Sequence, residues 1–416
     1  MRKEGRLFIR KKASPGLRNP SALCARQAAS GFQETFFSCK KFPLDASRQC
    51  TFKNCASQEF KDKTLGLCPK PYQGLRHPWT RQCVELFPLS QRSAQNLSQF
   101  ARWVWCSAIS QRTHSRAQKK STKRRPTLLH TIRNEILTVS IHSLGAQLSS
   151  IRANGTEYLW QGDPEIWADQ APVLFPYVAR LTKEQYHYGG ETYSLPIHGF
   201  AKDSEFAFSQ ESPQAMAFSL SDSPETRRAY PFPFRFTVSY RLEGNRLIQG
   251  FLVENPGPDT MFFGLGGHPG FRVPLEEGLR FEDYRVELSP EAQPVRVGFT
   301  PQCFLNGQDK PYPLESGVLP LSHSLFDEDA IVLREPGCGA RLYSPRGGRA
   351  VAVDFPGFPY LGLWHRPHTS APYVCIEPWC SLPSRQDLVE DLAEQPSLLS
   401  LPAGETLGRE IIFTFD

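Results

Sequence analysis

Two ionisable residues stand in segments where a charge is costly to bury. Glu377 follows the apolar run that opens YVCIEPW (373–379), and His268 lies between glycines and a proline in FFGLGGHPGF (262–271). Burial raises the pKa of a carboxyl group and makes the carboxylate a stronger base. An imidazole titrates near neutrality, and the proline that follows it favours an extended backbone. We therefore predict a general base at Glu377 and a general acid at His268.

Three further polar residues lie in apolar surroundings. Arg180 ends the run PVLFPYVARL (172–181), where it fits either a side chain that reaches solvent from a strand end or a rigid donor for ligand hydroxyl groups. His198 precedes a glycine in LPIHGFAKDSEF (195–206), and Lys202 follows four residues later. Taken alone, His198 is typical of a turn, so only the combination of these residues indicates a functional site.

Two aspartates precede a predicted strand in LFDEDAIVL (325–333). An acidic turn before a strand is common, so neither Asp327 nor Asp329 is distinctive by itself. The residues alone leave open which of the two belongs to a site.

The cysteines do not indicate a metal site. Seven of the eleven precede residue 128, and none of these forms paired CxxC motifs or a His-x3-His at the spacing of a zinc site. Cys375 and Cys380 lie in or beside an apolar run and are predicted to be ordinary buried thiols. We expect neither a metal nor disulfide bonds.

Short segments of alternating apolar and polar residues fill the chain from about residue 130 to its end. Turn signals rich in Gly, Pro, Asn and Asp separate them. The pattern predicts one large all-β domain over residues 128–416, an antiparallel β-sandwich with little helix. The predicted strands are ILTVSIHS (136–143), FRFTVSYRL (234–242), LIQGFLVEN (247–255), YRVELS (284–289), AIVLRE (330–335), RLYSP (341–345), AVAVDF (350–355), YVCIEPW (373–379) and EIIFTF (410–415).

Charge divides the chain into two parts. Residues 1–127 carry 26 Lys and Arg against 6 Asp and Glu, whereas the remaining residues carry 22 against 36. The basic part lacks sustained periodicity, so we expect it to be disordered. We interpret it as translation from upstream of the real start, with a nucleic-acid-binding arm, an organelle transit peptide and a small folded domain as alternatives. The sequence shows no apolar run long enough to span a bilayer and no secretory signal.

Residues 130–416 resemble the aldose 1-epimerase (galactose mutarotase-like) family, and in particular its LacX-like bacterial branch. The resemblance implies a large antiparallel β-supersandwich with a sugar bound on a concave face. It rests on eight motifs in the family's order: SLGAQLSSI (143–151), YLWQGDPEIW (158–167), PVLFPYVARL (172–181), HGFAKDSEF (198–206), GGHPGF (266–271), LFDEDA (325–330), FPYLGLW (358–364) and CIEPW (375–379).

The family interconverts the α and β anomers of a free aldose without a metal or a cofactor. The resemblance implies that Glu377 is the base that takes the proton of the anomeric hydroxyl, and that His268 is the acid that protonates the ring oxygen. Arg180 and His198 match family residues that bind hydroxyl groups and polarise the sugar. The substrate expected from the resemblance is an aldohexose.

Two features leave the substrate open. The family's binding aspartate falls on Asp329 or Asp327, and Asp329 lies closer to the predicted strand. HGFAK looks more like the relatives that accept phosphorylated hexoses, so Lys202 could contact a phosphate. A hexose-6-phosphate mutarotase and a non-catalytic carbohydrate-binding protein are therefore alternatives. A glycosidase is not favoured, because it needs two carboxylates and this sequence has no second carboxylate in a matching strand motif. We expect a small-molecule sugar as partner, no nucleic acid or membrane, a monomer or homodimer, and a cytoplasmic location.

Overall fold

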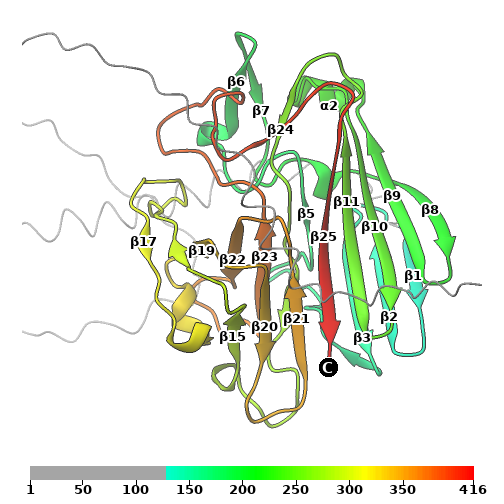
Figure 1. Cartoon of the computed structure of the whole chain (residues 1–416), viewed down its shortest axis with the longest axis vertical. Coiled ribbons are helices and arrows are strands. Elements are labelled where there is room, and N and C mark those ends of the chain that lie inside the picture. Colours follow the sequence, from blue (N-terminus) through cyan, green and yellow to red (C-terminus); the bar gives the residue numbers. More distant parts are fainter. Residues whose placement is uncertain (1–127) are drawn as a thin grey trace, which may run out of the picture. The chain divides into compact units, whose positions relative to one another are not determined.

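The computed structural model describes residues 128–416, and the regular secondary structure of this part of the chain consists almost entirely of β-strands (Figure 1). The strand pairs of its two large sheets are antiparallel. The predicted fold class is thereby confirmed. The basic extension predicted for residues 1–127 lies outside the described residues, so the domain boundary at residue 128 stays a prediction.

The larger sheet has nine strands and joins distant parts of the chain. Its last strand in sequence lies between two strands that come much earlier, as Figure 1 shows for β25 between β21 and β11. In order across the sheet the strands are β18 (Val318–Pro320), β15 (Arg285–Leu288), β20 (Gly339–Tyr343), β21 (Ala350–Asp354), β25 (Thr406–Phe415), β11 (Arg246–Glu254), β10 (Arg235–Glu243), β9 (Ala215–Ser221) and β8 (Ala207–Ser212).

The second large sheet has eight strands and carries the candidate site. Its centre is β23, which pairs with β22 on one side and with β13 and β14 on the other. Across the sheet the strands are β17 (Lys310–Pro311), β16 (Val295–Arg296), β19 (Ile331–Arg334), β22 (Tyr360–Trp364), β23 (Tyr373–Trp379), β13 (Gly266–Gly267) and β5 (Val173–Leu174), with β14 (Gly270–Arg272) beside β23.

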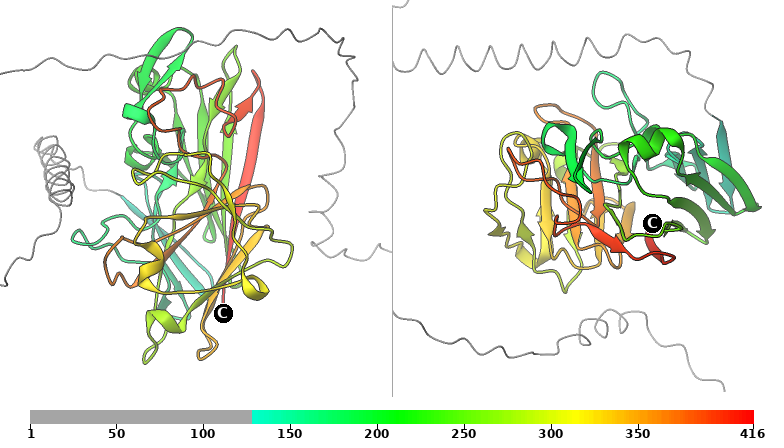
Figure 2. Two further views of the ribbon diagram at one scale, coloured as in Figure 1. Left: turned by 90° about the vertical axis from the view of Figure 1, so that its left-hand side faces the viewer. Right: turned by 90° about the horizontal axis from the view of Figure 1, so that it is seen from above.

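Smaller elements close the edges and ends of the two sheets. Within residues 128–416 the one α-helix, α2 (Pro224–Ala229), lies at the ends of the strands β9 and β10 that it connects (Figures 1 and 2). The remaining strands are β1 (Leu129–Arg133), β2 (Leu137–His142), β3 (Leu148–Ala153), β4 (Thr156–Glu157), β6 (Gln185–Tyr188), β7 (Glu191–Ser194), β12 (Met261–Phe263) and β24 (Leu399–Leu401). Five 3-10 turns are η2 (Thr182–Glu184), η3 (Ala201–Asp203), η4 (Phe281–Asp283), η5 (Glu315–Gly317) and η6 (His323–Phe326).

Alternation of side chains explains why these segments form strands that pack face to face. Along β10 buried residues alternate with exposed ones, so Phe236 and its neighbours on that face point inward. Phe236 stacks on Phe175, which follows β5, with ring centroids 4.5 Å apart. Phe271 of β14 likewise meets Phe413 of β25 at 5.9 Å. These contacts show that the two large sheets share one core, as predicted for a sandwich.

All nine predicted strands form; β23 has the predicted limits, and the ends of the other eight differ from theirs. The largest difference is in β25, which begins at Thr406 rather than at residue 410 because it pairs along its length with β11. None of the helices found between residues 128 and 416 has both the length and the apolar character needed to cross a bilayer.

Candidate active site

Glu377 lies in the middle of β23, and every residue of that strand is buried. Because side chains alternate along a strand, Tyr373, Cys375 and Glu377 face the same side of the sheet. Gly362 of β22 stands opposite Glu377 in register. The sheet thus holds the carboxyl group where solvent barely reaches it, with a side-chain exposure of 1%.

His268 is fixed by the strands on both sides of it. β13 and β14 each pair with β23, and only His268 and Pro269 link them. The backbone N–H of His268 donates to the carbonyl of Pro172 at 3.0 Å, and the carbonyl of Pro269 accepts from Ile376 at 3.2 Å. A Cβ at Gly270 would lie 2.8 Å from an indole carbon of Trp167, so a glycine is needed for this close approach.

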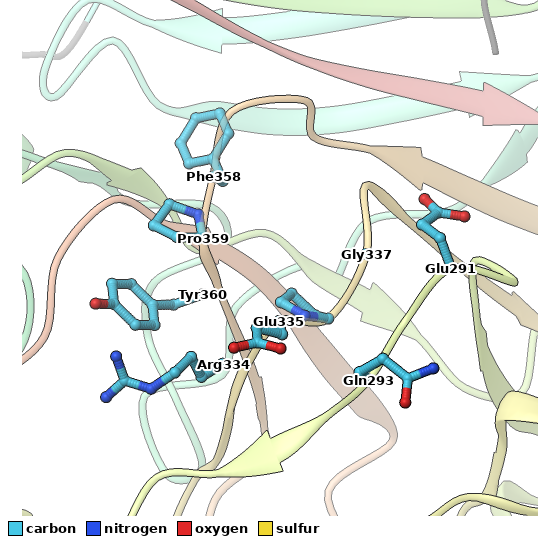
Figure 3. Close-up of a pocket in the computed structure, with 9 residues that line it drawn as sticks. Glu291, Gln293, Arg334, Glu335, Gly337, Phe358, Pro359 and Tyr360 are labelled. Atoms are coloured by element: carbon cyan, nitrogen blue, oxygen red, sulfur yellow. The ribbon is translucent and has the colours of Figure 1, made fainter. Parts of the chain in front are cut away.

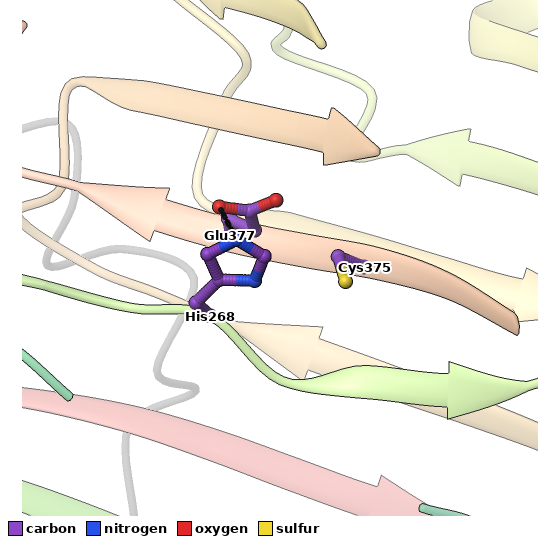
Figure 4. A group of neighbouring side chains, drawn as sticks. All are labelled: His268, Cys375 and Glu377. Atoms are coloured by element: carbon purple, nitrogen blue, oxygen red, sulfur yellow. Dashed lines mark ion pairs between the residues drawn. The ribbon is translucent and has the colours of Figure 1, made fainter. Parts of the chain in front are cut away.

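The imidazole and the carboxyl group meet in the interior (Figure 4). His268 Nε2 lies 3.2 Å from Glu377 Oε2, and the histidine side chain is 9% exposed. Within the described part of the chain, His268 Nδ1 has no hydrogen-bond partner, and Glu377 Oε2 makes no hydrogen bond despite its contact with His268 Nε2. Because buried polar atoms are normally paired, these two atoms indicate a place where a ligand binds.

Burial makes both groups favour their uncharged forms. It raises the pKa of the Glu377 carboxyl well above its usual range, and the nearby charge of Asp329 raises it further. It lowers the pKa of the His268 imidazole to about 3. The pair therefore tends to hold one proton, on Glu377, beside a neutral imidazole.

His198 lies beside His268 with a defined tautomer. Its Nδ1 accepts a hydrogen bond from the backbone N–H of Ala179 at 3.1 Å, so the neutral ring carries its proton on Nε2. Burial lowers its pKa well below the usual value, and the positive charges of Lys202 and Arg180 act in the same direction. The two rings meet edge to face at 5.5 Å. His198 is thus a neutral hydrogen-bond donor next to the pair.

The two predicted cations differ in their availability. Arg180 is exposed, and its guanidinium makes no hydrogen bond or ion pair with the residues that the structure describes. Lys202 Nζ instead donates to Asp203 Oδ2 at 2.7 Å, and its side chain is only 20% exposed. The charge of Lys202 is therefore already balanced by its neighbour.

The structure separates the two aspartates that the sequence left open. Asp329 lies close enough to Glu377 to raise its pKa, and it accepts hydrogen bonds from Cys303 Sγ at 3.1 Å and from the Ala330 N–H at 2.9 Å. Asp327 points elsewhere, with its Oδ1 3.3 Å from Nδ1 of His368. Asp329 is thus the aspartate that the fold brings to the pair.

Two tryptophan side chains contact His268. Trp167 stacks on the imidazole at 5.1 Å and on Tyr373 at 5.3 Å, while Trp364 meets the imidazole edge-on at 5.6 Å. The sequence alone assigned no role to Trp167 or Trp364. The signal that could have found them is their position in two of the eight motifs, YLWQGDPEIW and FPYLGLW.

Cys375 adds a sulfur atom to the same place. One ligand atom from each of His268, Cys375 and Glu377 lies within 4.8 Å of the other two. Burial raises the pKa of the thiol well above its usual range, and the charge of Glu377 adds to this. Cys375 and Cys380 are both free and buried, as predicted.

A separate, open cavity of about 460 Å³ lies among the ends of β19 and β22 and the start of β20 (Figure 3). Arg334 lies over the ring of Tyr360 at 5.5 Å and forms an ion pair with Asp309. None of the predicted site residues lines this cavity, so its volume alone does not indicate the chemistry. The lining residues are Glu291, Gln293, Arg334, Glu335, Pro336, Gly337, Phe358, Pro359 and Tyr360.

Known proteins share this sequence and fold. A family model described as "Aldose 1-epimerase" matches residues 128–413. The plasmid-encoded protein LacX of Lactococcus lactis subsp. lactis is 35% identical over 277 residues, which are 64% of this chain and 92% of LacX.

Solved structures agree with this match. A galactose mutarotase related enzyme from Lactobacillus acidophilus is 34% identical with a TM-score of 0.65, and the match covers 70% of this chain and 97% of that one. A galactose mutarotase-like protein from Lactobacillus casei is 32% identical with a TM-score of 0.66, covering 70% of this chain and all of that one. The family resemblance drawn from the eight motifs is confirmed.

The backbone around His198 provides a test of how the site is held. Gly199 has φ +72°, and a Cβ there would collide with the carbonyl oxygen of Phe175. Gly189 has φ +59° with no atom near its missing Cβ, so Gly189→Ala is a matched control that carries only the left-handed strain of about 1–2 kcal/mol. We expect Gly199→Ala to lower the free energy of unfolding by clearly more than Gly189→Ala, measured by urea denaturation. Equal losses would show that the turn relaxes without cost.

Proposed function

We propose that this chain, which belongs to the aldose 1-epimerase family, interconverts the α and β anomers of an aldohexose by opening and reclosing the sugar ring. The observation that carries the proposal is the buried contact of 3.2 Å between His268 and Glu377. Mutarotation adds a proton to one sugar oxygen and removes a proton from another. A base and an acid side by side, with unpaired polar atoms between strands, suit that reaction.

Ring opening uses the ionic form of the pair. The Glu377 carboxylate takes the proton of the anomeric hydroxyl while the His268 imidazolium gives its proton to the ring oxygen. The bond between the anomeric carbon and the ring oxygen breaks, and the anomeric C–O becomes a carbonyl. After rotation about the bond between the first two carbons, both transfers run backward and close the ring on the other face. Each transfer typically contributes on the order of 10²–10⁴-fold in rate.

The pair holds one proton throughout the cycle. After ring opening Glu377 is protonated and His268 is neutral, which is the form that burial favours. The open-chain aldehyde is thus accompanied by the more stable protonation state of the pair. A bound sugar must favour the ionic state at the start, and its hydroxyl groups can do so by donating to the carboxylate.

The surrounding side chains fit a polyhydroxylated ligand. His198 presents Nε2–H, Arg180 has free donors, and Asp329 supplies acceptors. The faces of Trp167 and Trp364 suit the C–H faces of a sugar. We assign these residues to substrate binding.

An unphosphorylated hexose is the substrate that the charges favour. Lys202, the residue that could contact a phosphate, already pairs with Asp203 at 2.7 Å. A phosphate would have to share the three donors of the Lys202 ammonium with that carboxylate, or use Arg180. The alternative of a non-catalytic sugar-binding protein does not account for a paired base and acid. A monomeric or homodimeric state and a cytoplasmic location stay predictions.

The activity can be tested with optical rotation. We expect the purified full chain to accelerate the mutarotation of fresh α-D-glucose or α-D-galactose, and to act less on glucose 6-phosphate. Glu377→Gln and His268→Asn should each lower kcat/KM by about 10²–10⁴-fold, because each removes one proton transfer.

Exposed residues of the same types supply the controls for this assay. Glu165→Gln and His187→Asn should act like the wild type, since both residues are exposed and lie outside the site. A folded wild-type chain that accelerates none of the sugars would contradict the proposal and favour a binding protein. Full activity in either site variant would remove that residue from the mechanism.

The shared proton also predicts the pH dependence of kcat/KM. A second proton reaches His268 only near its lowered pKa of about 3, and the single proton leaves Glu377 only above its raised pKa. The rate should therefore be flat across the neutral range, where an ordinary imidazole titrates, and should fall on the alkaline side. An acid limb with a midpoint near pH 6.5, the usual value for imidazole, would show instead that His268 titrates freely.

A further inference from the structure

The mutarotase reaction gives Cys375 no part, although its thiol lies beside the catalytic pair. It is on the same face of β23 as Glu377, two residues earlier, and Figure 4 shows its sulfur beside the imidazole ring. All three residues are buried, and their ligand atoms lie within 4.8 Å of one another. The structure therefore brings nitrogen, sulfur and oxygen donors together at one point.

This donor set has the chemistry and nearly the spacing of a zinc site. Zinc takes His nitrogen and carboxylate oxygen at about 2.0 Å and Cys sulfur at about 2.3 Å, in a tetrahedron. Two such nitrogen and oxygen ligands stand about 3.3 Å apart in a tetrahedron with those bond lengths, and His268 Nε2 and Glu377 Oε2 are 3.2 Å apart. The Cys375 sulfur lies within 4.8 Å of a ring nitrogen of His268 and a carboxylate oxygen of Glu377, and it must approach to about 3.5 Å to complete three corners.

Two further observations favour a cation there. Glu377 Oε2, a proposed ligand atom, is buried and lacks a hydrogen-bond partner among the described residues. A divalent ion bound by one carboxylate and one thiolate is neutral as a unit, and a neutral unit is tolerated in the interior far better than a single charge.

We propose that a thiophilic divalent cation, Zn²⁺ or Cd²⁺, binds to His268, Cys375 and Glu377 and excludes the sugar. The metal–sulfur and metal–oxygen bonds replace the S–H bond of Cys375 and the O–H bond of protonated Glu377, whose two protons leave to solvent, and no oxidation is involved. The inhibition rests on the proposed function, because the ion occupies the base and the acid of mutarotation. Binding of the ion does not depend on the proposed function.

Binding can be tested with Cd²⁺ and the full chain, followed by the ultraviolet absorption of the cadmium–thiolate bond. Cys375→Ser removes the sulfur ligand, and Cys380→Ser is the matched control because Cys380 is also buried but lies outside the cluster. Both variants keep all the other cysteines, so the absorption of those thiolates cancels when the spectra of the two variants are subtracted. We expect the wild type and Cys380→Ser to share an absorption component that Cys375→Ser lacks. Equal spectra for the two variants would overturn the site.

Inhibition is the second readout. In metal-free buffer Cys375→Ser should keep wild-type mutarotation, and Zn²⁺ should inhibit it at least about tenfold more weakly than it inhibits the wild type and Cys380→Ser. Equal inhibition of all three would overturn the proposal. A cadmium–thiolate difference in a wild-type chain that has no mutarotase activity would support the site and contradict the proposed function. Cys375→Ala provides the same comparison if the serine variant does not fold.

Discussion

The burial of a carboxyl group against an imidazole is the constraint on which the rest of the site depends. Charges are costly in the interior of a sheet, so burial shifts the pKa of both groups toward their uncharged forms, with one proton on the pair. In the proposed mechanism this environment is useful, because protons pass between the pair and the sugar without exchange with water.

The central strands of the second large sheet hold this pair in place. β23 carries Glu377 and is held between β22 and the two short strands that flank His268. The residues proposed to bind the sugar come from segments at the margins of the same sheet: Arg180 after β5, His198 in the turn whose Gly199 bridges to Phe175, and Asp329 just before β19. A rigid centre with variable margins lets a fold keep one chemistry while the contacts to the substrate change.

The fold could be predicted from sequence because alternation is a local signal. Each strand of the large sheets shows its apolar face within a few residues, and the turns between strands carry Gly, Pro, Asn and Asp. Glu377 and His268 were found for a related reason, since each interrupts an apolar or glycine-rich run where a polar residue is unexpected.

Other parts of the site depend on three-dimensional placement that alternation does not encode. Asp327 and Asp329 have the same local sequence signal, and only the turn before β19 decides which one nears Glu377. An aromatic residue that lines a site follows the same pattern as one in a core, so Trp167 received no role. The pairing of Lys202 with Asp203 likewise depends on side-chain direction in a short turn.

Infrared difference spectroscopy tests the shared proton most directly. The wild-type chain at neutral pH and without sugar is compared with Glu377→Gln, and the carbonyl stretch of a protonated carboxylic acid is followed. We expect such a band in the wild type and not in the variant. The band should weaken when a sugar binds, because the bound sugar favours the ionic form of the pair. A wild type without this band, whose His268 is an imidazolium by nitrogen NMR, would contradict the neutral pair.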